Sequence, residues 1–369
     1  MQLKGFIVKI LRRTNYLFAF LLLLSYLSVY VHPRTFWPLS IFGLLYPVFF
    51  IVNLFFIILW SFRKNKFLII SLLVILVGWS FMTRNIQVTF PFLHRQQSVD
   101  PPIKIMSYNV RLFNLYKWID SPDAIDEIMD FVEEESPDII CLQDFYTRKR
   151  GKFSETEINT RLKKNKYRFI KYTLKKPGIS SYGIATYSAY PIINSGVISF
   201  ANSFNVCIYT DIIIRNDTIR LFNTHLQSYR FIKQNYDLVD SLRFEYNTEQ
   251  FKGIRDIAYR LKTGFIKRSV QTDTVSAYIK RSPYPVVVCG DFNDSPVSYT
   301  YQHMRGNLKD AFIEAGTGIG FTYVGKFPSY RIDYILHDNR FKAIDYKSPG
   351  MKLSDHRPVI CKLLPTNRK

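Results

Sequence analysis

Three long apolar runs without a charged residue lie before residue 84, and they constrain the fold more than any other feature of the chain. They span residues 14–31, 39–62 and 67–83. A helix that crosses a bilayer needs about 20 apolar residues, with a range of roughly 17–25. Pro47, inside the second run, is expected to kink that helix rather than to prevent it. The pattern predicts three transmembrane helices.

Positive charge is distributed unevenly around these runs. The basic residues before the first run and between the second and third are Lys4, Lys9, Arg12, Arg13, Arg63, Lys64 and Lys66. The segment between the first and second runs has only Arg34. Because cytoplasmic loops are rich in Lys and Arg, residue 100 onward is expected outside the cytoplasm. The runs contain no ionisable residue, which is typical of an anchor rather than a transporter.

The charge balance changes near residue 100. Residues 1–99 hold ten Lys and Arg, and the first acidic residue is Asp100, so 40 basic residues stand against 29 acidic ones in the rest. The predicted organisation is a three-helix membrane anchor over 1–84, a linker over 85–102 that closes with two prolines, and a domain over 103–365. The positive excess of this domain would attract nucleic acid or anionic lipid, or it is an ordinary solvated surface, since the basic residues are scattered.

After residue 102, short apolar segments typical of strands alternate with helical ones. Strands are expected at 103–110, 138–143, 182–188, 204–216, 218–226, 286–292, 331–337 and 358–364, and helices over 121–135 and 230–280. Several strands follow one another directly, which favours an α/β (α+β) core of two mixed sheets flanked by helices over a doubly wound parallel sheet. The four cysteines lie in strand-like segments without a zinc-type cluster. They are expected as core thiols, and the sequence leaves a disulfide open.

Polar side chains stand at the ends of many of these strands. They are Asn109, Gln143, Asp144, Asn223, His225, Asp291, Asn293, Asp333, Asp355 and His356. Groups at separate strand ends can converge on one rim of a sheet, where catalytic residues of layered folds commonly lie. Taken singly, each has a structural explanation, such as an Asx turn at 290–294 or a capping Asp at 354–358. Their occurrence together favours a functional site.

These residue types suit the hydrolysis of phosphate esters. Mg²⁺ prefers oxygen ligands and keeps several waters, so one or two carboxylates and an amide can hold it. A bound metal neutralises phosphate oxygens and stabilises the leaving oxyanion. A carboxylate–amide pair such as Asp291 and Asn293 can orient an attacking water and the phosphate. An Asp–His pair can hold an imidazole in position for proton transfer.

The ordered motifs resemble those of a known family. SYNVR, CLQD, YGIATYS, NTHL, GDFND, RIDYIL and SDHRPV follow one another as in the endonuclease/exonuclease/phosphatase superfamily, which is deoxyribonuclease I-like. The resemblance covers nearly all of 103–365 and implies a four-layered α/β sandwich as the catalytic domain. The chain is also similar to a bacterial membrane-anchored subgroup. That similarity implies a multi-pass protein of the bacterial inner membrane whose catalytic domain faces the periplasm or the exterior.

The resemblance implies a metal site and a water-activating pair. Asn109, Asp144 and Asp355 would bind or position Mg²⁺, with Mn²⁺ as a substitute. Asp291 would orient or deprotonate the attacking water, and Asn293 would bind the phosphate.

The resemblance also implies a proton-transfer pair and two further phosphate contacts. His356, oriented by Asp333, would act as a base or stabilise phosphate charge. His225 would contact phosphate or assist the leaving group, and Tyr182 would contact phosphate.

One position departs from the family pattern, which has Glu where this chain has Asp144. Asp is shorter by one methylene, about 1.5 Å, and Mg²⁺ requires near-ideal geometry. The metal is therefore expected to shift, or a water to bridge the gap.

The expected function is that of a membrane-anchored, Mg²⁺-dependent phosphodiesterase or phosphatase of nuclease-like type. The alternatives are a phospholipid or sphingolipid headgroup phosphodiesterase and a non-catalytic phosphate-binding module. The expected partners are a phosphate-ester substrate (nucleic acid, lipid headgroup or small phosphoester) and the lipid bilayer, with no obligate protein partner.

Overall fold

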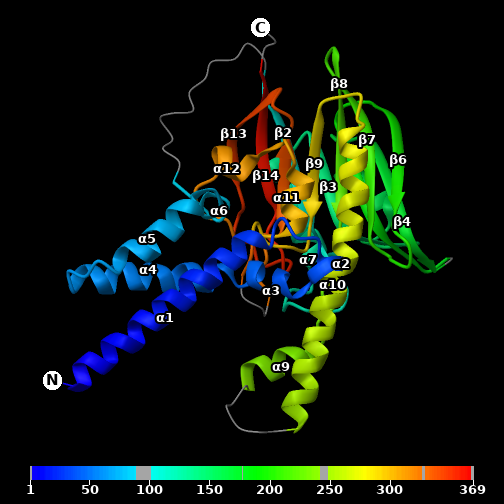
Figure 1. Cartoon of the computed structure of the whole chain (residues 1–369). Helices are drawn as coiled ribbons and strands as arrows, with labels where there is room; N and C mark the ends of the chain where they lie inside the picture. Colours follow the sequence, from blue (N-terminus) through cyan, green and yellow to red (C-terminus); the bar gives the residue numbers. More distant parts are fainter. Residues whose placement is uncertain (1, 89–100, 177, 242–247, 326–328, 367–369) are drawn as a thin grey trace.

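Two six-stranded sheets face each other, and helices cover their outer faces (Figure 1). The computed structural model describes residues 2–88, 101–176, 178–241, 248–325 and 329–366. The first sheet has the order β13 (Phe341–Lys347), β14 (Val359–Pro365), β2 (Ile103–Asn109), β3 (Ile139–Arg148), β5 (Ser180–Ser188) and β4 (Tyr167–Lys176). The second has the order β10 (Lys309–Asp310), β12 (Asp333–His337), β9 (Val286–Asp291), β8 (Asp217–His225), β7 (Val206–Ile214) and β6 (Ile192–Ser199).

Each sheet has one parallel pair at its centre and antiparallel strands around it. β2 runs parallel to β3, and β8 runs parallel to β9. Asn109 ends β2 and pairs with Gln143, so Asp144 in the middle of β3 lies beside the end of β2. His225 and Asp291 end the parallel neighbours β8 and β9, which finish at the same edge of the second sheet. This arrangement places the predicted site residues at one rim of the sandwich.

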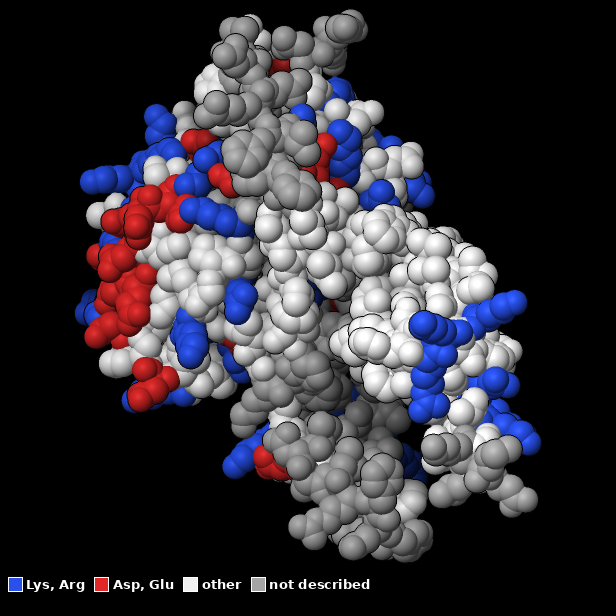
Figure 2. All heavy atoms as spheres, turned by 90° about the vertical axis from the view of Figure 1, so that its left-hand side faces the viewer, with Lys and Arg blue, Asp and Glu red and all other residues white. Residues whose placement is uncertain are grey.

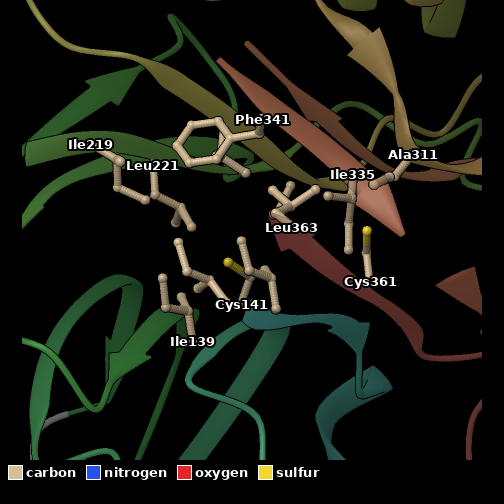
Figure 3. Packing of buried hydrophobic residues seen from close by; sticks show 14 of the residues in the cluster. Ile139, Cys141, Ile219, Leu221, Ala311, Ile335, Phe341, Cys361 and Leu363 are labelled. Carbon is tan, nitrogen blue, oxygen red and sulfur yellow. The ribbon is translucent and has the colours of Figure 1, made fainter. Parts of the chain in front are cut away.

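The inner faces of the two sheets bury a shared aliphatic core. Figure 3 shows Ile139 and Cys141 of β3 facing Ile219 and Leu221 of β8, beside Leu363 of β14. These side chains alternate with outward-facing residues along their strands, as the period of two in a strand requires. All four cysteines are buried free thiols, as expected.

Helices on the outer faces complete a four-layered arrangement. On the first sheet, α7 (Ala124–Glu135) packs Ile128 and Val132 against Tyr108 and Leu142. The second sheet is covered by α10 (Thr248–Lys280) and α11 (Tyr299–Arg305). The other elements of this region are η2 (Arg111–Asn114), α8 (Glu155–Arg161), α9 (Lys233–Ser241), α12 (Ala311–Ala315) and β11 (Gly318–Ile319). The predicted core of two mixed sheets flanked by helices is confirmed.

The structure does not support the three predicted transmembrane helices. Within the N-terminal helical unit (residues 2–85), the helices are α1 (Gln2–Leu27), α2 (Pro33–Phe36), α3 (Pro38–Leu44), α4 (Tyr46–Phe62), α5 (Leu68–Val77) and α6 (Trp79–Thr83). In the part of the chain that the structure describes, no single helix is long and apolar enough to cross a membrane. One pair, α3 with α4, passes that test together but is bent by 57°.

The physical reasons lie at the breaks between these helices. The first half of α1 carries charged residues, so the apolar part of that helix is short. The second run breaks at Leu45, directly before the helix that contains Pro47. The third run breaks at Gly78, where a Cβ would lie 2.0 Å from the ring of Tyr26, so the close packing of that ring requires glycine.

The predicted linker is partly ordered into structure. Its residues 89–100 lie outside the described residues. Before them, β1 (Ile86–Gln87) pairs antiparallel with β11, with Ile86 opposite Ile319. The chain is thus held against the sandwich directly after α6.

Large apolar side chains of α1 and α4 are exposed on the N-terminal helical unit. They include Leu17, Phe20, Leu23, Val48, Ile51, Phe55 and Ile58. Figure 2 shows a broad uncharged surface on this side of the molecule, with Lys and Arg gathered toward one end of it. An apolar area of this kind is typical of a surface that contacts a membrane or another protein.

Candidate active site

A cavity of about 500 Å³ lies at the rim where the strands of both sheets end. Eight of the nine predicted site residues line it: Asn109, Asp144, Tyr182, His225, Asp291, Asn293, Asp355 and His356. The ninth, Asp333, lies behind His356 and is 1% exposed. The structure therefore brings together groups that are up to 247 positions apart in the sequence.

Asp333 and His356 form a buried hydrogen-bonded pair. The imidazole Nδ1 of His356 lies 2.9 Å from Oδ2 of Asp333, which begins β12. Burial alone opposes the charged imidazolium, but the carboxylates of Asp333 and Asp291 raise the pKa of His356 to about 10. The other ring nitrogen, Nε2, lies 3.7 Å from Oδ2 of Asp291. His356 is therefore held as a cation between two acids at the cavity wall.

Asp291 ends β9 and is 1% exposed. Its Oδ1 accepts a hydrogen bond of 2.8 Å from the backbone N–H of Asn293, which is the expected Asx turn. Its Oδ2 accepts a hydrogen bond of 2.9 Å from the Asn109 amide. Burial raises the pKa of Asp291 to about 6, which nearby His356 opposes. The Asx turn is therefore present, and Oδ2 of Asp291 still faces the rings of His225 and His356.

Asp144 and His225 form a second acid–imidazole pair at the cavity. The register of β3 against β5 shifts between Leu142 and Phe145, and Asp144 inside this bulge has a φ of 47°. The bulge turns the Asp144 carboxylate toward His225, whose Nδ1 lies 3.4 Å from Oδ1. The Nε2 of His225 lies 3.7 Å from Oδ2 of Asp291. His225 therefore lies between carboxylates of the two sheets.

Asp355 is paired with Arg111, a residue that the sequence reasoning missed. The Nη1 of Arg111 lies 2.7 Å from Oδ2 of Asp355, and its guanidinium stacks 4.2 Å above the Trp118 ring. Arg111 lines the cavity and has a φ of 42°. The one sequence feature that pointed to a role for Arg111 at the site is its position two residues after Asn109.

Tyr182 lines the cavity near the first sheet. Its hydroxyl lies 3.5 Å from that of Tyr116, and this hydrogen bond lowers the pKa of Tyr182. By contrast, Gln143 and Asn223 do not reach the cavity. The Gln143 amide donates a hydrogen bond of 2.7 Å to Oδ1 of Asn223, which joins β3 to β8 inside the core. These two polar strand ends have a structural role.

The donor atoms around the cavity fit a divalent metal of the hard type. Asn109, Asp144 and Asp355 offer amide and carboxylate oxygens, and both carboxylates are partly exposed. Oxygen donors with two negative charges match the preference of Mg²⁺. A second group of Asp291, Asp333 and His356 has potential ligand atoms within 4.8 Å of one another. Its imidazole Nδ1 is already engaged by Asp333, so the oxygen set is the better candidate.

Comparison with known sequences separates the chain into two parts. Residues 106–356 match the model of the endonuclease/exonuclease/phosphatase family, and residues 8–85 match a domain of unknown function. No curated protein matches the chain.

The fold is similar to several solved structures. An endonuclease/exonuclease/phosphatase from Beutenbergia cavernae is 15% identical, with a TM-score of 0.51 and 72% of each chain covered. One from Bacteroides vulgatus is 15% identical, with a TM-score of 0.51, covering 72% of this chain and all of that one. The catalytic domain of human Nocturnin is 16% identical, with a TM-score of 0.50, covering 75% of this chain and 99% of that one. At these identities, the likeness concerns the fold.

Proposed function

Because the chain belongs to the endonuclease/exonuclease/phosphatase family, we propose that it is a metal-dependent hydrolase of phosphate esters. The observation that carries the proposal is the buried pair of Asp333 and His356, which stands beside Asp291 at the wall of the cavity. A charged pair of this kind costs folding free energy when it is buried, so its presence at a cavity supports a chemical role.

Asp291 and Asn293 would position the attacking water. The carboxylate of Asp291 accepts hydrogen bonds from Asn109 and from Asn293, which fix its orientation. Its raised pKa favours acceptance of a proton from water as the new phosphorus–oxygen bond forms. Asn293 stands at the same turn, where its amide can contact a phosphate oxygen.

The two histidines would act on the phosphate and the leaving group. His356 with a raised pKa is protonated at neutral pH, which favours stabilisation of phosphate charge over action as a base. His225 lies between Asp144 and Asp291 and can give a proton to the leaving oxygen. Tyr182 would add a phosphate contact from the first sheet.

Mg²⁺ or Mn²⁺, held by Asn109, Asp144 and Asp355, would neutralise phosphate oxygens and the leaving oxyanion. In the structure, Arg111 supplies positive charge beside Asp355. This guanidinium would turn to a substrate phosphate when the carboxylate binds metal.

We also propose that the N-terminal helical unit holds the protein at the bacterial inner membrane, with the catalytic domain on the periplasmic side. Its exposed apolar side chains support contact with lipid. The guanidinium of Arg12 lies 4.4 Å over the Phe67 ring, so the basic residues of α1 lie at the same end as those of the α4–α5 turn. A reporter that is active only in the cytoplasm and works when fused after residue 100 would contradict this topology.

The function is tested by incubation of the full chain with Mg²⁺ and with DNA, RNA, phospholipid vesicles or small phosphodiesters. We expect release of a phosphate-ester product from at least one class, and a much slower release by His356→Ala. Binding of inorganic phosphate without turnover of any of these substrates would favour the non-catalytic module instead.

A further inference from the structure

The N-terminal helical unit is docked on the loop that follows the catalytic turn. Val297 is 1% exposed and packs in one apolar cluster with Leu22, Val29 and Phe49. Near it, the buried guanidinium of Arg84 donates a hydrogen bond of 3.3 Å to the Pro296 carbonyl. These contacts begin only three residues after Asn293, so the unit is fixed against the wall of the active site.

A second set of contacts fixes the other side of the same loop. His32, which caps α2, lies 3.1 Å from Oδ2 of Asp273 on α10, and its ring packs edge-on against Tyr299. The Tyr299 hydroxyl donates a hydrogen bond of 2.7 Å to the same Asp273 carboxylate. Figure 1 shows α2 and α3 against the body of the sandwich, whereas α1, α4 and α5 extend away from it.

Leu44, at the end of α3, lines the active-site cavity. Two contacts with the catalytic domain fix the position of Leu44. The hydroxyl of Tyr330 donates a hydrogen bond of 2.9 Å to the Leu44 carbonyl. At the preceding Gly43, a Cβ would lie 2.3 Å from the Val297 carbonyl, so the backbone there touches the catalytic domain. A residue of the N-terminal unit therefore forms part of the wall of the catalytic cavity.

Leu44 shares this cavity with several apolar and aromatic side chains. Phe204, Tyr229, Phe231, Tyr330 and Ile332 line the same cavity. Asp144, Asp355 and the two histidines form its polar part. A phosphate held by the polar part would therefore carry its ester group into apolar surroundings, where alkyl groups gain free energy by leaving water.

We infer that the N-terminal helical unit is a specificity element of the active site, and that Leu44 selects phosphodiesters in which one ester group is an apolar alkyl chain. This inference rests on the proposed hydrolase function. It assigns to this unit, residues 2–85, a role in substrate choice. Leu45, the next residue, is exposed, so the chain passes from the cavity to the surface at the end of α3.

The test uses two probes with the same leaving group, 4-nitrophenyl methyl phosphate and 4-nitrophenyl butyl phosphate. In both, a water oxygen bonds to phosphorus and gives a proton to Asp291, the bond to nitrophenolate breaks with its electron pair, and an alkyl phosphate remains. The ratio of kcat/KM for the butyl probe to that for the methyl probe reports only the alkyl group. The full chain is assayed with Mg²⁺ as wild type, Leu44→Ser and the matched control Leu45→Ser.

We expect Leu44→Ser to lower this ratio by about 4- to 15-fold, the equivalent of one to two buried methylene groups. Leu45→Ser should keep the wild-type ratio, because Leu45 does not line the cavity. If Leu44→Ser does not fold, Leu44→Val should lower the ratio by about 2- to 4-fold.

Two results would overturn the inference alone: an unchanged ratio in Leu44→Ser or Leu44→Val, or an equal fall in Leu45→Ser. If the wild type hydrolyses neither probe, and hydrolyses no nucleic acid or lipid, the proposed function and the inference are both overturned.

Discussion

Nδ1 of His356 and Oδ2 of Asp333 lie 2.9 Å apart, and both side chains are buried. Asp333 begins a strand of the second sheet, whereas His356 precedes a strand of the first. The hydrogen bond therefore joins the two sheets at the active-site rim. It fixes the imidazole so that Nε2 points toward Asp291.

Asp333→Asn should lower kcat by about 10²- to 10⁴-fold with little change in KM, because the imidazole loses its charge partner and its orientation. His356→Ala should cause a loss of the same size. The double variant should lose no more than either single one, because the two residues act as a unit. Additive losses, measured by steady-state kinetics on one phosphodiester, would contradict a shared role.

Activity should disappear on chelation and return with Mg²⁺ or Mn²⁺. The reason is the oxygen donor set of Asn109, Asp144 and Asp355, which suits hard divalent ions. The measurement is hydrolysis after treatment with EDTA and after titration of each metal. Full activity of a metal-free preparation would rule out this mechanism.

Asp144→Ala should shift the Mg²⁺ dependence of activity to higher concentration, whereas Asp144→Glu should retain activity or raise it. The bulge with a φ of 47° at Asp144 already turns the backbone toward the cavity, so the added methylene of Glu extends a carboxylate that is correctly aimed. Asp217→Asn, at the exposed start of β8, is a control that should not alter the profile. An unchanged Mg²⁺ profile in Asp144→Ala would show that Asp144 is not a ligand.

Gly43→Ala should destabilise the docked form of the N-terminal helical unit by roughly 1–3 kcal/mol, as overpacking commonly does. The new methyl group would lie 2.3 Å from the Val297 carbonyl and 2.4 Å from the Ser28 hydroxyl. Gly5→Ala is the control, because its Cβ would meet nothing within 4 Å. Limited proteolysis between residues 85 and 102 reports the docking. Equal cleavage of the two variants would argue against a tight interface.

Acid should destabilise the fold partly through Glu314. Burial alone would raise its pKa, but the His337 imidazole, whose Nε2 lies 3.2 Å from Oε2, and a hydrogen bond from the Ala343 backbone N–H lower the pKa of Glu314 from 4.5 to about 2. A depressed pKa stabilises the folded state above the unfolded value. This contribution is therefore complete above pH 4.5 and is lost as the pH falls toward 2.

At neutral pH, Glu314→Gln should unfold at a lower urea concentration than wild type. Its free energy of unfolding should be lower by roughly 1–3 kcal/mol. The difference should shrink as the pH is lowered, because protonated Glu also loses its charge. Glu134→Gln, on the exposed face of α7, should show neither effect. A difference that stays constant across this range would exclude the proposed linkage.

The strands that carry the site could be predicted from the sequence, because their polar residues end continuous apolar segments. Asp291 after five buried residues of β9 is one example. Six strands of the described residues were missed, and three of them, β4, β6 and β13, are longer than two residues. The edge strand β4, for example, mixes Lys and Arg with apolar residues and is only partly buried, so it has no clear local pattern.

Arg111 was missed because its approach to Asp355 depends on left-handed backbone at 111–114, which sequence periodicity does not reveal. The apolar runs were read as spans because length and hydropathy are local properties. Their breaks depend on distant contacts, such as Tyr26 against Gly78. The docking of the N-terminal helical unit also depends on residues that are far apart in the sequence. His32 and Asp273, for example, are 241 positions apart.

The four cysteines are suited to spectroscopic work on this protein. All are free and fully enclosed, and burial raises the pKa of Cys141, Cys207 and Cys361. A thiol reacts with maleimides as its thiolate, so the folded chain should take up almost no label. A single cysteine introduced on the exposed face of α4 could therefore be labelled selectively in the otherwise native sequence. Fluorescence from that position would report whether α4 meets lipid, protein or water.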